Sequence, residues 1–401
     1  MKSKMNPVID NYLELAKTAK NAGNNEQCEQ YCNKILEIEN NNAMAWALKG
    51  SAAGWQSSLA SPRIEEMLVC YGTAINYALD DQQAKALEEQ ANTEYVHVVN
   101  AMFDLQCERF QKWPDAEEAG AFNKLFISTI TAGINMMKHS RIALRCITNL
   151  DEIRFPLAVK VNNCAVDAET AIRQEFQNSN DGHPSDYDFR EMIQKEGCCY
   201  TVLETAVAIG ENDDKSNVIR WKNMINNHEY CISACSYEKE YSNVTVGYWY
   251  YVKHLSLAED AVQIRRGIIA DLKQKISAAE ERIRRRRFNA YWEVHAEEKS
   301  RLEEEKRNLS HERAQLANEQ IRCKQSESVR QVQEEITDLE KRKAALGFFA
   351  LKEKKALSAQ LADRQAAREK MLSTLLGPLD ERMKQIDQRL RSIDTELTRE
   401  R

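Results

Sequence analysis

Apolar residues recur at intervals of three and four along most of the chain, and this spacing predicts amphipathic helices. Residues 12–42 contain two such stretches, which are joined by the turn sequence Gly23-Asn24-Asn25. Residues 46–78 repeat the arrangement. We therefore predict that each of these two segments folds into a pair of antiparallel helices.

The two segments resemble tetratricopeptide (TPR) repeats, whose period is about 34 residues. Trp46 and Gly50 repeat the positions of Tyr12 and Ala16 at this spacing. In the second unit the second helix begins late, which enlarges the turn at residues 54–63. In the first unit the positions that define the family are taken by Leu15, Ala16, Ala19, Gly23, Cys28, Cys32 and Ile35. The resemblance implies an all-α body with two TPR-like units in residues 1–80.

TPR-type pairs bind extended peptides on a concave face, and the resemblance assigns six positions of this chain to that face. They are Leu13, Lys17, Lys20, Ala47, Ser51 and Trp55. Family members that hold a C-terminal carboxylate use Lys, Asn and Arg there. Leu13 and Ala47 break that set, so we do not expect a clamp for chaperone tails. The alternative is that later helices pack over this face and bury it.

Residues 81–255 are predicted to continue the body as a helical bundle. The expected helices are residues 82–113, 115–149, 158–177, 188–209 and 218–238. Residues 244–252 are rich in β-branched and aromatic side chains, which favour strands. Because no similar run is available to pair with it, we interpret this stretch as the start of the next helix.

Residues 256–401 are predicted to form a charged coiled coil. From Leu372 to Leu397, apolar residues alternate at spacings of four and three, which is the coiled-coil pattern. Gly347 stands inside a dense apolar patch at residues 346–351, between two segments of equal length, 299–345 and 352–398. We therefore predict an antiparallel helical hairpin with its tip at 346–351. Gly347 and a break at Gly377-Pro378 disfavour the alternative, a continuous rod that pairs with a second chain.

The end of the chain also resembles a tail found on uncharacterised bacterial proteins behind differing N-terminal modules. The resemblance rests on residues 290–299, the leucine-spaced helix after them, and the patch at 346–351 followed by residues 352–355. It covers about the last third of the chain and implies a structural module with no known activity. Phe348 and Phe349, at the predicted tip, are candidate contacts for a partner.

Composition supports a helical, intracellular protein. Only 13 of 401 residues are Gly and 6 are Pro, too few for the many tight turns of a β-sandwich or barrel. No segment approaches the ~18 uncharged apolar residues of a membrane span, and no signal sequence is evident, so we expect a cytoplasmic location. Residues 1–255 carry 24 Lys and Arg against 35 Asp and Glu, whereas residues 256–401 carry 32 against 27. The shift predicts a domain boundary near residue 256.

The 11 cysteines are expected to be reduced. Cys28 and Cys32 are spaced to share one helix face, as are Cys231 and Cys235, and His228 lies one turn before Cys231. Such a pair could hold half a zinc site. Free cysteine is also a common buried apolar residue in helix packing. We therefore expect no metal and no cofactor, and we keep a metal-dependent enzyme as the less favoured hypothesis.

One basic cluster, Arg284-Arg285-Arg286-Arg287, is the candidate for binding nucleic acid or an anionic membrane. The aromatic residues that follow it, including Trp292, could stack on bases. Glu280 and Glu281, however, precede the first two arginines by four residues, which favours ion pairs within the helix. A solvated helix face is the preferred interpretation.

No nucleotide-binding loop, zinc-protease motif or nucleophile elbow occurs in the chain, and we identify no catalytic residue. The sequence therefore predicts a non-catalytic scaffold or adaptor. In this hypothesis a TPR-like body recognises a protein partner of unknown identity, and the coiled coil spaces or dimerises the chain.

Overall fold

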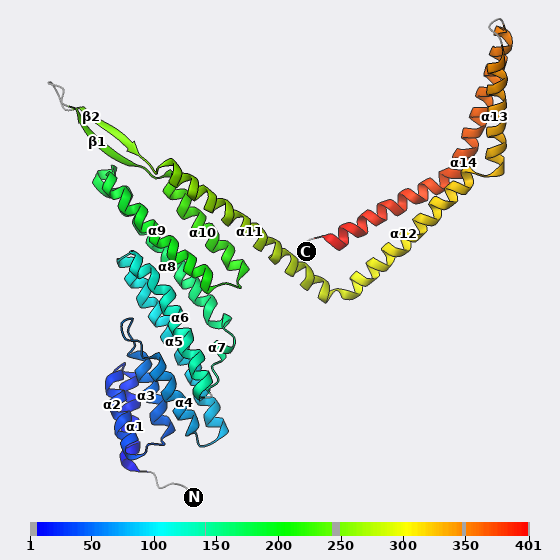
Figure 1. The fold of residues 1–401 in the computed structure, drawn as a ribbon. Helices are drawn as coiled ribbons and strands as arrows, with labels where there is room; N and C mark the ends of the chain where they lie inside the picture. The colour runs from blue at the N-terminus through cyan, green and yellow to red at the C-terminus, as the bar shows by residue number, and fades with distance from the viewer. Residues whose placement is uncertain (1–5, 141, 243–248, 347–349, 400–401) are drawn as a thin grey trace. The chain divides into compact units, whose positions relative to one another are not determined.

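The computed structural model describes residues 6–140, 142–242, 249–346 and 350–399. The chain has an all-α fold with one short β-hairpin (Figure 1), so the predicted fold class is confirmed. It divides into two compact units, unit 1 (Met1–Ile283) and unit 2 (Arg284–Arg401). None of the described helices combines the length and the apolarity needed to cross a bilayer.

Unit 1 contains helices α1 to α10, both strands and most of α11. The helix bounds are α1 Pro7–Asn21, α2 Asn25–Ile38, α3 Ala43–Trp55, α4 Ile64–Asn76, α5 Asp81–Lys112, α6 Ala116–Ser140, α7 Arg145–Thr148, α8 Asp151–Asn178, α9 Asp186–Ile209, α10 Asp214–Ser233 and α11 Glu259–Val294. A 3₁₀ turn, Ser179–Gly182, follows α8. The predicted helix at 115–149 is thus divided, because α6 ends at Ser140 and α7 forms a separate turn.

Side-chain caps mark where most of these helices begin. The side chains of Asn6, Asn24 and Asn42 accept a backbone N–H from the first turn of α1, α2 and α3. Such caps satisfy N–H groups that have no partner within the helix. Between α1 and α2, Gly23 adopts a φ of 74°, a conformation that other residues avoid. The polar residues at each turn therefore divide the early chain into short antiparallel helices.

The helices of unit 1 pack as successive pairs: α1 with α2, α3 with α4, α5 with α6, and α8 with α9. The first helix of each pair also contacts the first helix of the next, so that α1, α3, α5 and α8 form one continuous row. Small residues allow the close approach of α3. A Cβ added to Gly50 would lie 2.9 Å from the Met67 carbonyl oxygen, and one added to Gly54 would lie 2.4 Å from Met67 Sδ. One apolar core runs through most of the unit.

The prediction that residues 244–252 begin a helix is wrong for the part that the structure describes. Trp249–Leu255 forms strand β2, which pairs antiparallel with β1, Ser236–Ser242. The register places Ser236 opposite Leu255. Residues 243–248 lie outside the described residues. The partner strand was missed because its sequence, Ser-Tyr-Glu-Lys-Glu-Tyr-Ser, lacks the apolar alternation of a half-buried strand.

The division between the units falls 28 residues after the compositional boundary expected near residue 256. The first part of α11 belongs to unit 1, because Ile269, Leu272, Ile276 and Ala279 are buried in its core. These residues keep helical spacing within a charged sequence. The change in charge content therefore marks the start of α11, and the division between the units lies farther along the helix.

Unit 2 consists of the end of α11 with α12, Ala296–Lys324, α13, Glu327–Ala345, and α14, Leu351–Thr398. Helix α14 packs against both α12 and α13. Its direction is antiparallel to theirs, because Arg389 pairs with Glu305 whereas Arg364 pairs with Glu335. Of the predicted hairpin tip at residues 346–351, the central residues Gly347, Phe348 and Phe349 lie outside the described residues.

Two details of unit 2 differ from the sequence prediction. Helix α14 continues through Gly377 and Pro378, where we expected a break. The segment 299–345, which was predicted to be one continuous helix of the hairpin, is instead interrupted at Gln325 and Ser326. Proline removes one backbone hydrogen bond, and contacts with a neighbouring helix can maintain the helix around it.

Candidate functional site

Three of the six residues predicted to line the binding face meet at the carboxylate of Glu94, on α5. Lys20 Nζ lies 2.8 Å from Glu94 Oε1. Ser51 Oγ donates to the same oxygen at 3.1 Å. Trp55 Nε1 donates to Glu94 Oε2 at 2.7 Å. Helices α1, α3 and α5 thus contribute to one polar cluster on the row of first helices.

The cluster stabilises the charged form of Glu94. Burial by itself would raise the pKa of this carboxyl group, but the hydrogen bond and charge of Lys20 act in the opposite direction. The hydrogen bonds from Trp55 and Ser51 add to that effect, so the pKa lies below its ordinary value. The carboxylate is therefore ionised at neutral pH and holds the indole in place.

Trp55 is the exposed part of this cluster. The residue is 43 % exposed, whereas Ser51 is fully buried beneath it. Its indole N–H is already satisfied by Glu94, which restricts the rotation of the ring. A rigid, half-exposed aromatic ring is the kind of side chain that anchors protein interfaces.

The other predicted face residues have different environments. Lys17 is exposed and pairs with Glu14 on its own helix at 2.8 Å. Leu13 is partly buried and packs against the small cores of the first pair. Ala47 and Ser51 are both completely buried, so the assignment of these two residues to a partner-binding surface is wrong. The position of α3 explains this, because the helix packs against α1, α2, α4 and α5.

A cleft missed by the sequence analysis lies at the turn between α3 and α4. One lobe, of about 320 Å³, is bounded by Leu59 and Pro62 of the turn and by Lys124 of α6. An adjoining lobe of about 640 Å³ reaches Trp113 at the end of α5. Arg109 lines both lobes. The enlarged turn at residues 54–63 was the available signal, but sequence alone did not show which helix it faces.

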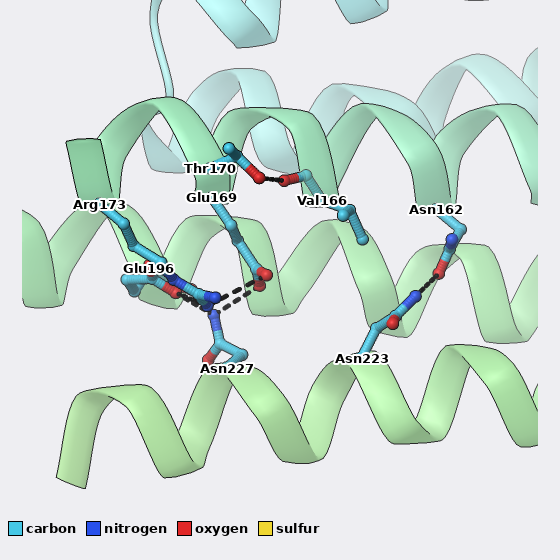
Figure 2. A network of polar contacts seen from close by, with 8 residues as sticks. All are labelled: Asn162, Val166, Glu169, Thr170, Arg173, Glu196, Asn223 and Asn227. Carbon is cyan, nitrogen blue, oxygen red and sulfur yellow. Dashed lines mark hydrogen bonds and ion pairs between the residues drawn. The ribbon is translucent and has the colours of Figure 1, made fainter. Parts of the chain in front are cut away.

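A second polar cluster, fully inside unit 1, joins α8, α9 and α10 (Figure 2). Arg173 donates to Glu196 through Nε at 2.7 Å and through Nη2 at 3.0 Å, and its Nη2 also reaches Glu169 at 3.1 Å. Asn227 Nδ2 donates to Glu169 at 2.8 Å and to the Glu196 carboxylate at 2.6 Å. Asn227 and Glu196 are fully buried, and Glu169 is 3 % exposed. Two carboxylates therefore share one arginine.

Burial and the negative charge of Glu196 raise the pKa of Glu169 to about 7. Burial also raises the pKa of Glu196, although Arg173 opposes this change. The Arg173 guanidinium lies 4.3 Å from the centre of the Tyr230 ring, which covers it from one side. The cluster can hold one proton near neutral pH. It also links three helices by polar contacts of fixed geometry.

The possible zinc motif does not lie on one helix, because α10 ends at Ser233 and Cys235 follows it. His228 Nδ1 is 2.8 Å from Arg265 Nη1, and its ring lies 4.4 Å from that of Tyr200. Burial and the charge of Arg265 lower the pKa of His228 to about 4. Cys231 is fully buried and Cys235 partly so. Within the described part of the chain, no group of three or more His, Cys, Asp or Glu side chains is arranged to bind a metal ion.

The basic cluster Arg284–Arg287 lies on α11 at the start of unit 2, and all four side chains are exposed. Arg284 and Arg286 each interact with another group of the protein, so neither of these two side chains is without a partner. Trp292, which only the less favoured nucleic-acid hypothesis offered for stacking on bases, is 5 % exposed and packs against Leu302 and Ile393. Leu302 belongs to α12 and Ile393 to α14, so side chains of both helices cover this ring. The ring is thus not accessible in the way that the nucleic-acid hypothesis required.

Comparison with known proteins adds no functional information. No protein family matches the chain, and no curated protein matches it. One matching solved structure is the cryo-EM structure of a de novo designed 16-helix transmembrane nanopore, with 10 % sequence identity. The match covers 97 % of this chain and 99 % of the nanopore chain, but its TM-score is 0.17. Such a low score carries no argument about fold or function, so the resemblance to TPR proteins remains a prediction.

Proposed function

We propose that this chain is a non-catalytic scaffold or adaptor for protein–protein interactions. Unit 1 recognises a protein partner on the row of first helices, and unit 2 provides a long helical arm for spacing or self-association. Helix α14 alone has 48 residues, a length of about 70 Å at about 1.5 Å per residue. The arm exposes charged side chains along most of this length.

The observation that carries the proposal is the fixed, half-exposed ring of Trp55. Its hydrogen bond to Glu94 is supported by Lys20 of α1 and by Ser51, which lies one turn before Trp55 on α3. The ring is thus preorganised, and a partner that packs on it loses little conformational entropy. Lys17 lies on the same helix as Lys20, one turn closer to the N-terminus, and remains exposed at the edge of the cluster.

The two lysines of the predicted face, Lys17 and Lys20, differ in exposure and in the carboxylate that each contacts. Lys20 has 24 % of its side chain exposed and is tied to Glu94, so it stabilises the face. Lys17 has 46 % of its side chain exposed and contacts only a neighbouring turn. We therefore expect Lys17→Glu to weaken partner binding without unfolding the body, whereas Lys20→Glu also lowers the melting temperature.

The test compares two exposed tryptophans. Full-length wild type, Trp55→Ala and Trp113→Ala are used as baits in quantitative capture from the native host, after circular dichroism confirms equal helicity. Trp113 is 60 % exposed and lies away from the Glu94 cluster. We expect one reproducible set of proteins to be lost with Trp55→Ala and retained with Trp113→Ala. A fourth bait, Trp55→Phe, keeps the ring but removes the donor to Glu94, and should retain part of the capture.

Two outcomes would contradict the proposal. Equal capture by wild type and Trp55→Ala would show that this face is idle. Loss with Trp113→Ala alone would place recognition in the cleft between the α3–α4 turn and α6.

A further inference from the structure

Two cysteines from different helices lie against each other inside unit 1. Cys107 is on α5 and Cys164 is on α8, and Cys164 Sγ lies 3.7 Å from the carbonyl oxygen of Cys107. The two thiols also interact directly, and this contact, followed by burial, raises the pKa of Cys164. Helices α5 and α8 belong to consecutive pairs of the stack.

A polar contact next to the two cysteines also joins α5 to α8. One turn before the cysteines, Lys160 Nζ of α8 lies 2.5 Å from Asp104 Oδ1 of α5 and 3.1 Å from the carbonyl oxygen of Asn100. The two thiols therefore lie within a packed contact between α5 and α8. A disulfide needs its two sulfur atoms close together and its Cα atoms within about 7 Å.

The two thiols differ in their access to solvent. Cys107 is partly exposed, whereas Cys164 is 3 % exposed. A small oxidant can reach Cys107 from the surface. Cys164 is placed behind it, where it can react with an oxidised Cys107 but not with the oxidant itself. This is the arrangement of an attacking and a resolving cysteine.

We propose that Cys107 and Cys164 form an oxidation site that closes to an intramolecular disulfide in the presence of a peroxide. The Cys107 thiolate attacks one oxygen of hydrogen peroxide, the O–O bond breaks, and hydroxide leaves with the proton that Cys107 released, as water. The sulfur of Cys164 then attacks the sulfur of the Cys107 sulfenic acid. The S–O bond breaks, and its hydroxyl leaves as water with the Cys164 proton. Two thiols lose two electrons, and one peroxide is reduced to two waters.

The bond would join the third and fourth helix pairs covalently. It encloses the segment between residues 107 and 164, which contains α6 and α7. Closing a loop of this length restricts the unfolded chain more than the folded one, so the oxidised protein should melt at a higher temperature. The site is independent of the proposed partner face, because neither cysteine contributes to the Glu94 cluster.

The chain supplies an internal negative control. Cys28 and Cys32 also interact with each other, but both lie on α2 and both are fully buried. Without exposure, neither thiol is accessible to peroxide. Proximity of two thiols is therefore common to the two pairs, whereas exposure of one partner and placement on two different helices are found in the pair Cys107 and Cys164 alone.

The experiment treats the reduced full-length protein with hydrogen peroxide, alkylates the remaining thiols, and analyses a non-reducing digest by mass spectrometry. We expect a linked peptide pair containing Cys107 and Cys164, sensitive to reductant, while Cys28 and Cys32 are recovered unlinked. The melting temperature of oxidised wild type should rise by several degrees, whereas Cys107→Ser should not respond to peroxide. This readout does not require a partner, so its failure is distinct from failure of the proposed function.

Two results would overturn the proposal. One is sulfinic acid on Cys107 with Cys164 still free to be alkylated, which would show that the second thiol cannot resolve the first. The other is that Cys107 and Cys164 both stay reduced after an exposure that oxidises Cys323, a thiol of similar accessibility in unit 2.

Discussion

The two units of this chain are stabilised in different ways, although both are helical. Unit 1 has a continuous apolar core and a polar cluster in which Glu169, Glu196 and Asn227 are buried. In the described part of unit 2, only six apolar side chains are buried: Trp292, Leu302, Val329, Ile336, Ile386 and Ile393. Its helices are joined mainly by exposed ion pairs such as Glu305 with Arg389. Similar helical content thus conceals a difference in packing, and packing determines which unit can present a rigid surface.

The largest expected effect tests the buried cluster of unit 1. Replacing Arg173 with Met leaves the carboxylates of Glu169 and Glu196 buried without their shared partner. Breaking a buried ion pair in this way costs about 3 to 5 kcal/mol. Urea unfolding followed by circular dichroism should show the loss. The matched control is Arg389→Met in unit 2, whose ion pairs are solvent-exposed, and we expect it to be indistinguishable from wild type.

The next prediction concerns the six buried apolar side chains of unit 2, which form a thin seam between its helices. Ile393 is fully buried against Trp292 and Leu302, so Ile393→Ala should destabilise unit 2 by about 2 to 4 kcal/mol. The fluorescence of Trp292 should shift to longer wavelength, while the unfolding of unit 1 is unchanged. Leu351, which is 75 % exposed on the same helix, serves as the control position. An equal response to Leu351→Ala would show that seam burial does not stabilise this unit.

A smaller effect is expected from titration of Glu169. Its pKa rises from 4.5 to about 7 on folding, so the folded state retains a proton that the unfolded state has lost. The stabilisation is present at low pH and disappears as pH rises from about 4.5 to 7, by about 1.4 kcal/mol for each unit of pKa shift. Glu169→Gln should flatten this part of the stability curve of unit 1. If stability falls with pH equally in wild type and in Glu169→Gln, the raised pKa of Glu169 is refuted.

The smallest expected effect on stability comes from the test of hairpin register. The sequence predicts that residues 332 and 368 face each other, and nearby Arg364 pairs with Glu335 at 3.2 Å. Cysteines introduced at 332 and 368, in a background without Cys323, should crosslink within one chain. Helicity should change little. Crosslinks only between chains would favour the rod-like dimer.

The sequence predicted much of the local structure but fewer of the long-range contacts. It located the start of α4 at Ile64 and the end of α5 before Pro114, since caps, prolines and helical periodicity are local signals. It did not predict that Lys20 meets Glu94, which lies 74 residues away. Nothing in the spacing of Glu169 and Glu196 distinguishes them from surface residues, because burial of a charge depends on which helices become neighbours.

Hydrogen exchange measured by mass spectrometry on the intact chain tests the difference between the units most directly. Amides of α8, α9 and α10 around Glu169 and Asn227 should exchange slowest, and those of α13 and the first half of α14 much faster under the same conditions. The account predicts two separate protection classes, divided near residue 283. Equal protection of α9 and α13 would contradict it, because it would show that the thin seam is as stable as the buried core.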